Sequence, residues 1–202
     1  MKIVRLFTVS ALVLPLLVGC TPVDSSGEGS PDPDVTVPEE TASPSEISWT
    51  IPDSCAVESV ISAISAAGFP GAVDVTPPWT PAAGTDLAAA LDAGGIACGY
   101  GIPETDSGVT VYWVANSADV FASTASAVWV PEGANAVDLD LNRDETIAYF
   151  QQTDASADAE YPHWEVNVLF EGGLWLHVAT SAWNDPDDGN SIIEEMLQLA
   201  SD

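Results

Sequence analysis

The chain of 202 residues is strongly acidic, with 31 Asp and Glu against three Lys and Arg and a formal net charge of −28. Proteins that bind nucleic acid neutralise its phosphates with many Lys and Arg side chains. Lysine clamps for nucleotide phosphates need the same residue types. The composition therefore excludes nucleic acid as a partner and argues against a nucleotide site of that kind.

The first 19 residues predict a secretory signal peptide. Lys2 and Arg5 give a short positive segment, and residues 6–19 are apolar or small. This run is about 14 residues long, whereas a helix that spans a membrane needs about 20. Pro15 weakens a spanning helix further. A positive start followed by a short apolar run is the pattern of a peptide that directs export.

The apolar run ends in Leu17-Val18-Gly19-Cys20, which resembles the lipobox of bacterial lipoproteins. In that family the peptide is cut just before the cysteine, and the cysteine sulfur carries a diacylglycerol. The resemblance implies that a lipidated Cys20 anchors the protein to the extracytoplasmic face of the cell membrane, where two acyl chains hold a soluble domain stably. An ordinary signal peptide followed by a chance cysteine is the alternative interpretation.

Residues 20–46 predict a disordered acidic tether. They are rich in Pro, Ser, Gly and acids without an apolar period, and such a segment buries too little surface to repay chain ordering. Residues 47–202 have the size of a single globular domain.

Export changes the charge of the chain. Without residues 1–19 the chain keeps one basic side chain, Arg143, against all 31 acids, which gives a formal charge of −30. An anionic membrane surface would repel this domain, so the expected membrane contact is the lipid. The acidic, nearly lysine-free composition resembles that of secreted proteins of high-GC Gram-positive bacteria.

Two cysteines remain in the domain, Cys55 and Cys98. An even number of cysteines in an exported chain predicts one disulfide. In the chain-entropy model, closing a loop of about 43 residues is worth roughly 4 kcal/mol. A reactive or metal-binding pair is the alternative, although no His or third Cys lies near either residue in the sequence.

The first half of the domain predicts alternating helices and strands. Apolar residues at helical spacing indicate a helix that begins at Asp53 or Ser54 and ends at Gly68. A proline-rich loop over 70–84 and a short helix over 85–93 follow. Alternation then predicts a strand over 96–102, a turn over 103–108 and a second strand over 109–115.

The second half begins with a predicted helix over 117–129 and a short strand or extended loop over 136–142. Residues 144–152 predict a short helix with Asp144 as its cap. Residues 163–182 give the clearest strand signal, and residues 191–200 predict a final helix with Ser191 and Glu194 as a capping box.

The register of the hairpin over 163–182 follows from burial. A three-residue loop, Glu171-Gly172-Gly173, places two apolar sets on the same face of the sheet, and a two-residue loop would separate them. The two sets are Trp164, Val166, Val168 and Phe170, and Leu174, Leu176 and Val178.

The same register turns four other side chains to the opposite face and brings Asn167 opposite His177. We interpret these four residues as a candidate contact patch, since aromatic side chains are enriched at interfaces. Two alternatives remain open: a helix covers the patch, or it is a solvated face with a single Trp. The patch residues are Glu165, Asn167, Trp175 and His177.

Helices and hairpins in this order predict an α+β domain with an antiparallel sheet, helices mainly on one face and one disulfide. The sequence contains no G-x-S-x-G, no H-E-x-x-H and no P-loop. Carboxylates are too abundant for any particular pair to indicate a glycosidase-like site.

Calcium is the one cofactor for which the sequence offers a candidate. Asp140, Asn142 and Asp144 match positions one, three and five of an EF-hand-like loop, but Glu145 replaces the turn glycine and Gln151 the bidentate glutamate. A second stretch, residues 184–195, has Gly189 and Glu195 at suitable spacing. The alternative for both stretches is that their acids cap helices. In that case the protein holds no metal and no cofactor.

These features together predict a membrane-anchored domain outside the cytoplasm that binds an envelope protein or a small ligand without catalysis. A carboxylate-based hydrolase and a structural lipoprotein without a ligand are the alternatives. A cleft with an Asp/Glu pair of raised pKa would favour the hydrolase.

Overall fold

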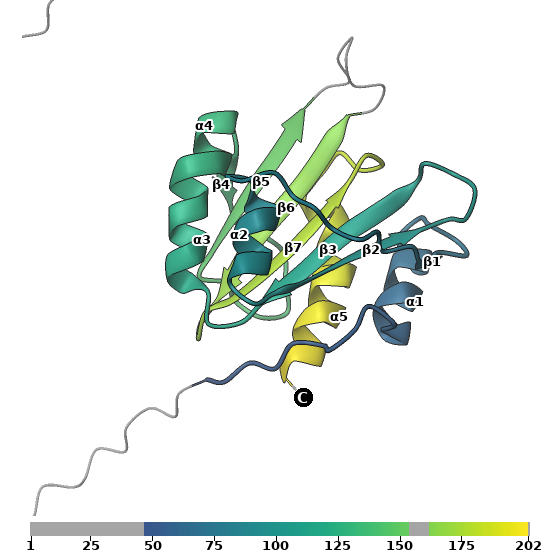
Figure 1. Ribbon diagram of the computed structural model, residues 1–202, viewed down its shortest axis with the longest axis horizontal. Coiled ribbons are helices and arrows are strands. Elements are labelled where there is room, and N and C mark those ends of the chain that lie inside the picture. Colours follow the sequence, from purple (N-terminus) through teal and green to yellow (C-terminus); the bar gives the residue numbers. More distant parts are fainter. Residues whose placement is uncertain (1–46, 154–161, 202) are drawn as a thin grey trace, which may run out of the picture. The chain divides into compact units, whose positions relative to one another are not determined.

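The computed structural model describes residues 47–153 and 162–201. The predicted signal peptide, Cys20 and the tether lie outside these residues. Within them, seven strands form one sheet in the order β1-β2-β3-β7-β6-β5-β4, and helices pack against it (Figure 1). No helix in this described part of the chain is long and apolar enough to cross a membrane.

The elements follow the chain with short connections, and every neighbouring pair of strands is antiparallel. The strands are β1 (Val73–Asp74), β2 (Ile96–Gly101), β3 (Gly108–Val114), β4 (Asn135–Val137), β5 (Ile147–Thr153), β6 (His163–Phe170) and β7 (Leu174–Thr180). The helical elements are α1 (Glu58–Ala66), α2 (Asp86–Asp92), α3 (Ala118–Thr124), the π-helical η1 (Ala125–Trp129), α4 (Val130–Glu132), the 3-10 turn η2 (Pro186–Gly189) and α5 (Asn190–Ser201).

The α+β class, the antiparallel sheet and the disulfide are confirmed. The helices, however, are divided between the two faces of the sheet. Helices α1 and α5 pack with Trp113 and Leu176 in one apolar core, and α2, α3 and η1 pack with Trp175 in a second core on the other face (Figure 1). Strand β7 is accordingly buried at every position, as expected of a strand covered on both faces.

The hairpin of β6 and β7 has the predicted three-residue loop and register. Phe170 pairs with Leu174 across the loop, and Asn167 lies directly opposite His177. Both predicted apolar sets belong to the core shared with α1 and α5. Gly172 and Gly173 have φ values of +82° and +81°, the left-handed conformation that glycine adopts without strain.

The helix predicted over 144–152 is wrong, because Ile147–Thr153 forms strand β5 and pairs with β6 along its whole length. The run contains Ile, Tyr and Phe, which favour strands. Ala148 and Phe150 contribute to one core, and Ile147 and Tyr149 pack against the other. Because both faces are covered, the run is apolar at successive positions and lacks the simple alternation of a half-buried strand.

The predicted cap of the last helix is also displaced. The capping box forms at η2, where Asp188 accepts from the backbone N–H of Asp185 and the Asp185 side chain caps the turn in return. Ser191 then lies inside α5, whose first residue is Asn190. Glu194 instead accepts a hydrogen bond from the backbone N–H of Asn142 at 3.0 Å.

The disulfide joins Cys55 to Cys98, with their sulfur atoms 2.05 Å apart. Cys98 is buried on β2, and Cys55 precedes α1, which begins at Glu58 and therefore later than the predicted cap at Asp53 or Ser54. The hydroxyl of Tyr100 donates to the Cys55 carbonyl at 2.9 Å. A covalent bond and a hydrogen bond thus fix the start of the domain to the sheet.

Candidate functional site

The four residues of the predicted contact patch do come together, on the face that α2 and α3 cover. Trp175, Asn167 and His177 are nevertheless 0%, 1% and 3% exposed. They form no open contact surface, and the alternative in which helices cover this face is correct. Glu165 keeps partial exposure, with 12% of its side chain accessible.

Helix α2 contributes an acid that the sequence did not single out. Asp86 is the first residue of α2, after the N-cap Thr85, whose hydroxyl accepts from the backbone N–H of Ala88 at 3.2 Å. This start of the helix directs the Asp86 carboxylate at the sheet, where the Tyr112 hydroxyl donates to its Oδ2 at 2.6 Å. Trp129 of η1 donates to the same oxygen at 3.4 Å.

Asn167 links the two strands of the hairpin. Its Oδ1 accepts from Trp175 Nε1 at 3.0 Å and lies 2.9 Å from His177 Nδ1. An indole N–H only donates, so the atom facing Trp175 must be the amide oxygen. An oxygen accepts, and therefore Nδ1 of His177 carries the ring proton and Nε2 carries the lone pair.

The environment of His177 keeps the imidazole neutral at neutral pH. Burial lowers the pKa of His177 more than the nearby carboxylates of Asp86 and Glu165 raise it. The ring also lies flat on Tyr112, with centroids 3.9 Å apart and planes 6° from parallel. Burial and then Asp86 raise the pKa of Tyr112 well above its usual value, so its hydroxyl remains a donor.

Asp86 has the opposite tendency. Burial acts to raise the pKa of this carboxyl, but His177 and the hydrogen bonds from Tyr112, Leu87 and Trp129 outweigh it and hold the pKa below its usual value. The carboxylate form is therefore stable at neutral pH.

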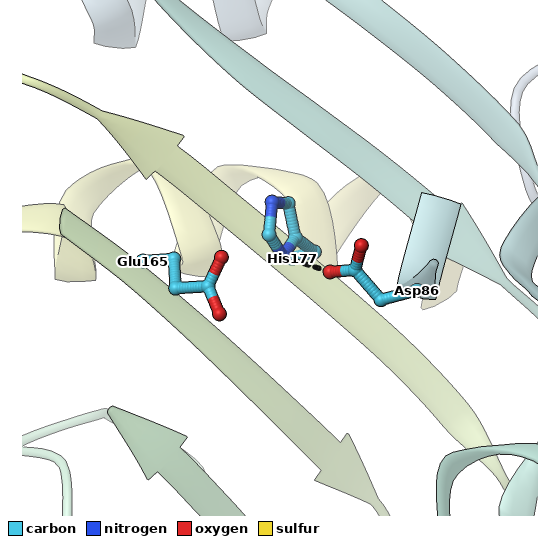
Figure 2. A group of neighbouring side chains, drawn as sticks. All are labelled: Asp86, Glu165 and His177. Atoms are coloured by element: carbon cyan, nitrogen blue, oxygen red, sulfur yellow. Dashed lines mark ion pairs between the residues drawn. The ribbon is translucent and has the colours of Figure 1, made fainter. Parts of the chain in front are cut away.

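Asp86, Glu165 and His177 form one compact cluster at the edge of this buried network. Each offers one donor atom within 4.8 Å of the other two, and Asp86 Oδ2 lies 4.0 Å from His177 Nδ1 (Figure 2). Figure 2 also shows the Glu165 carboxylate extending from β6 toward the ring. Two carboxylates and an imidazole in this arrangement can hold a cation or exchange protons with a ligand.

No Lys or Arg of the described residues neutralises these carboxylates. Arg143 is the single Lys or Arg among the described residues. Its guanidinium carbon lies 4.8 Å from the centroid of the Trp49 ring, and Trp49 belongs to the core on the other face of the sheet. Glu165 has one basic partner, His163, at 2.9 Å. The hydrogen bond to Glu165 is the main cause that raises the pKa of His163.

Gln151 adds an unsatisfied acceptor beside the cluster. It lies directly opposite Glu165 on β5 and is 8% exposed. Its Nε2 donates to the Glu132 carbonyl at 3.2 Å, whereas its Oε1 is buried without a hydrogen-bond partner. Buried acceptors of this kind are rare and point to a missing partner.

The two calcium candidates lie against each other. The backbone N–H of Asp140 donates to Asp187 Oδ1 at 3.0 Å, and Asn190 Nδ2 donates to the Asp140 carbonyl at 2.9 Å. Asp144 precedes a strand, whereas an EF-hand loop leads into a helix. Calcium at Asp140, Asn142 and Asp144 stays a prediction that rests on the match to loop positions, and the alternative in which Asp144 caps a helix loses that helix.

Two hollows of the surface lie away from the cluster. One of about 410 Å³ is lined by Val75, Pro77, Trp79 and residues 99–110. The other, of about 380 Å³ and mainly apolar, lies between α3, η1 and β5 and includes Phe121 and Tyr149. Neither is lined by Asp86, Glu165 or His177. The pKa of Asp86 in the cluster is lowered, not raised as in the acid pair that would favour a hydrolase.

The sequence indicated four residues of this region but missed Asp86, Tyr112 and Trp129. Tyr112 lies opposite His177 on β3, a pairing that the local pattern does not contain. Comparison of the chain with protein-family models, with curated proteins and with solved structures gives no match.

Proposed function

We propose that this protein is a lipid-anchored domain on the extracytoplasmic face of the cell membrane, and that it binds a ligand at the cluster of Asp86, Glu165 and His177. The observation that carries the binding function is the pair of carboxylates beside a neutral, buried imidazole without a Lys or Arg partner among the described residues. The motif Leu17–Cys20 supports the anchor, and the disulfide supports an oxidising compartment.

A non-catalytic role fits the cluster better than a hydrolase. A general acid needs a carboxyl whose pKa is raised toward the working pH, and the pKa of Asp86 is lowered. The polar atoms are instead held by hydrogen bonds from buried aromatic side chains. Such a fixed arrangement suits recognition of a ligand.

The anchor is tested by the mature N-terminus. Mass spectrometry of the protein from its native membrane should show cleavage before Cys20 and a mass increase from the acyl chains. A Cys20→Ala variant should leave the membrane fraction. An unmodified residue at the N-terminus, or cleavage elsewhere, would contradict the anchor.

The binding function is tested with the same preparation. Protein isolated from its native membrane should melt at a higher temperature than the same protein after unfolding in urea, dialysis and refolding with the disulfide intact, because a bound ligand stabilises the folded state. Glu165→Gln should remove the difference, and Glu58→Gln on α1, against the other face of the sheet, should preserve it. The binding function would be contradicted if the native and refolded proteins melted at the same temperature and the small molecules of the extract did not raise the melting temperature of the refolded protein.

A further inference from the structure

Resting on the proposed binding function, we propose that the ligand is a divalent first-row transition-metal ion such as Zn²⁺. His177, Asp86 and Glu165 would bind it, with the amide oxygen of Asn167 as the fourth donor. One nitrogen and three oxygens form a donor set that such ions accept.

The donor atoms already lie close to the spacing that a metal needs. His177 Nδ1 is 2.9 Å from Asn167 Oδ1 and 4.0 Å from Asp86 Oδ2, and the cluster of Asp86, Glu165 and His177 fits within 4.8 Å. Donors at about 2.0–2.2 Å from a tetrahedral zinc ion lie roughly 3.3–3.6 Å apart. The two carboxylates therefore need to move inward by about 1 Å, which their partial exposure of 21% and 12% allows.

Binding requires a change of tautomer at His177. Without metal, Nδ1 donates its proton to Asn167 Oδ1. When Nδ1 binds the ion, that proton leaves Nδ1 and one proton is taken up at Nε2, so the imidazole stays neutral. Asn167 Oδ1 is then released from the His177 proton while it still accepts from Trp175 Nε1.

The three proposed oxygen donors each have a hydrogen-bond partner outside the metal site. Tyr112 and Trp129 donate to Asp86, Trp175 donates to Asn167, and His163 contacts Glu165. Metal ligands in proteins are held in this way, and their hydrogen-bond partners fix both direction and basicity.

Charge and an unsatisfied atom support the same conclusion independently. The two carboxylates lie within 4.8 Å of each other, and a divalent ion would neutralise both where no Lys or Arg of the described residues does so. The buried Gln151 Oε1 beside Glu165 lacks a hydrogen-bond partner. A water molecule that enters the site with the ion, without binding the ion as a fifth donor, can donate to this atom.

The donor set also selects between metals. Calcium takes six to eight oxygen ligands in proteins, whereas this cluster offers a buried imidazole and few oxygens. We therefore expect Zn²⁺ to bind more tightly than Mn²⁺, and Ca²⁺ to bind at least 100-fold more weakly than Zn²⁺.

The test uses the full mature chain, untagged, in detergent, after treatment with a chelator. Isothermal titration with Zn²⁺ at pH 7 should give one tight site. The chain has two histidines, so the proton NMR signals of the imidazoles report the ligand directly. Zn²⁺ should shift the ring signals of His177 more strongly than those of His163, which contacts the ligand Glu165.

Two isosteric variants and their matched controls separate this site from the acidic surface. Asp86→Asn and Glu165→Gln should each weaken Zn²⁺ binding at least tenfold, whereas Asp119→Asn and Glu58→Gln, which alter exposed acids, should leave it unchanged. Tyr112→Phe, which keeps the ring on His177 but removes the donor to Asp86, should weaken binding by a smaller factor.

Three outcomes would overturn the metal site. They are wild-type affinity in both Asp86→Asn and Glu165→Gln, a shift of the His163 signals without a shift of those of His177, and no heat with Zn²⁺, Mn²⁺ or Ca²⁺. None of these outcomes contradicts the proposed anchor or the binding of some other ligand. The anchor is tested by the mature N-terminus, and ligand binding is tested by the melting temperature before and after refolding.

Discussion

At the scale of single residues, the central group is Asn167, because one amide oxygen serves two aromatic donors on β7. Trp175 and His177 reach it from the same side of the strand. Both rings are buried, so neither N–H has water as a substitute. The amide thus stabilises the fold and holds the His177 tautomer.

Asn167→Ala should therefore destabilise the domain by about 2–6 kcal/mol, since each of the two buried donors left without a partner costs about 1–3 kcal/mol. The measurement is urea unfolding followed by tryptophan fluorescence. Asn135→Ala is the control, because Asn135 is exposed on the edge strand β4 and should change stability by less than about 0.5 kcal/mol. A loss below about 1 kcal/mol in Asn167→Ala would show that the amide is not essential to the network.

Only the part of the site that lies on one hairpin could be predicted from the sequence. Asn167, Trp175 and His177 lie on adjacent strands of one hairpin, so alternation and loop length alone bring them together. Asp86 and Tyr112 arrive from α2 and β3, far along the chain, and only the pairing of β3 with β7 places them. That pairing depends on long-range packing, which has no local signature.

At the scale of elements, the prediction succeeded where the sequence pattern is compatible with only one type of secondary structure. The hairpin of β6 and β7 combines alternation with a glycine loop, and its register followed. Residues 147–153 have apolar side chains on both faces, and Asp144 before them resembles a helix cap. The strand was therefore missed because the covering of both faces removes the alternation by which strands are recognised.

The end of α2 lies unusually close to the sheet at Gly95. A Cβ atom there would lie 2.7 Å from the Trp113 carbonyl oxygen and 2.8 Å from the Ala90 carbonyl oxygen. Because both are backbone atoms, the contact can be relieved only by moving α2 away from β3. This close approach positions the start of β2 beneath the helix that carries Asp86.

Gly95→Ala should destabilise the domain by about 3 kcal/mol, the upper range for overpacking. The measurement is again urea unfolding. Gly99→Ala on strand β2, which begins directly after Gly95, is the control, because its Cβ would meet its nearest neighbour at 3.5 Å, an ordinary contact. It should be neutral or stabilising by about 0.5 kcal/mol, since alanine loses less backbone freedom than glycine on folding. Equal stability of the two variants would refute the close approach.

At the scale of the whole molecule, the chain has an unusual titration curve. Its single lysine is Lys2, in the predicted signal peptide, so a chain without that segment has no lysine to contribute to the alkaline part of the curve. Burial, and to a lesser degree Asp74, raise the pKa of Tyr100 to about 12. Its hydroxyl donates to the Cys55 carbonyl beside the disulfide.

The consequence is a loss of stability in alkali. The folded pKa of Tyr100 lies above its unfolded value of about 10, so its contribution is complete below pH 10 and is lost as the pH rises toward 12. Unfolding free energies measured by urea at pH 8.5 and 11 should fall less in Tyr100→Phe than in the wild type. An identical fall in both proteins would show that Tyr100 ionises freely.

One contact at the start of the described chain has a mechanical consequence. Trp49 donates to the Glu171 carbonyl at the hairpin loop, and the backbone N–H of Thr50 donates to the Ala200 carbonyl at the end of α5. Tension applied at Ile47 is therefore shared between the loop that joins β6 to β7 and the end of α5. Glu165 lies six residues before that loop, beyond the buried Asn167–His177 pair. A load on the residues before Ile47 would act on the loop end of the hairpin, whereas the cluster of Asp86, Glu165 and His177 lies toward the opposite end.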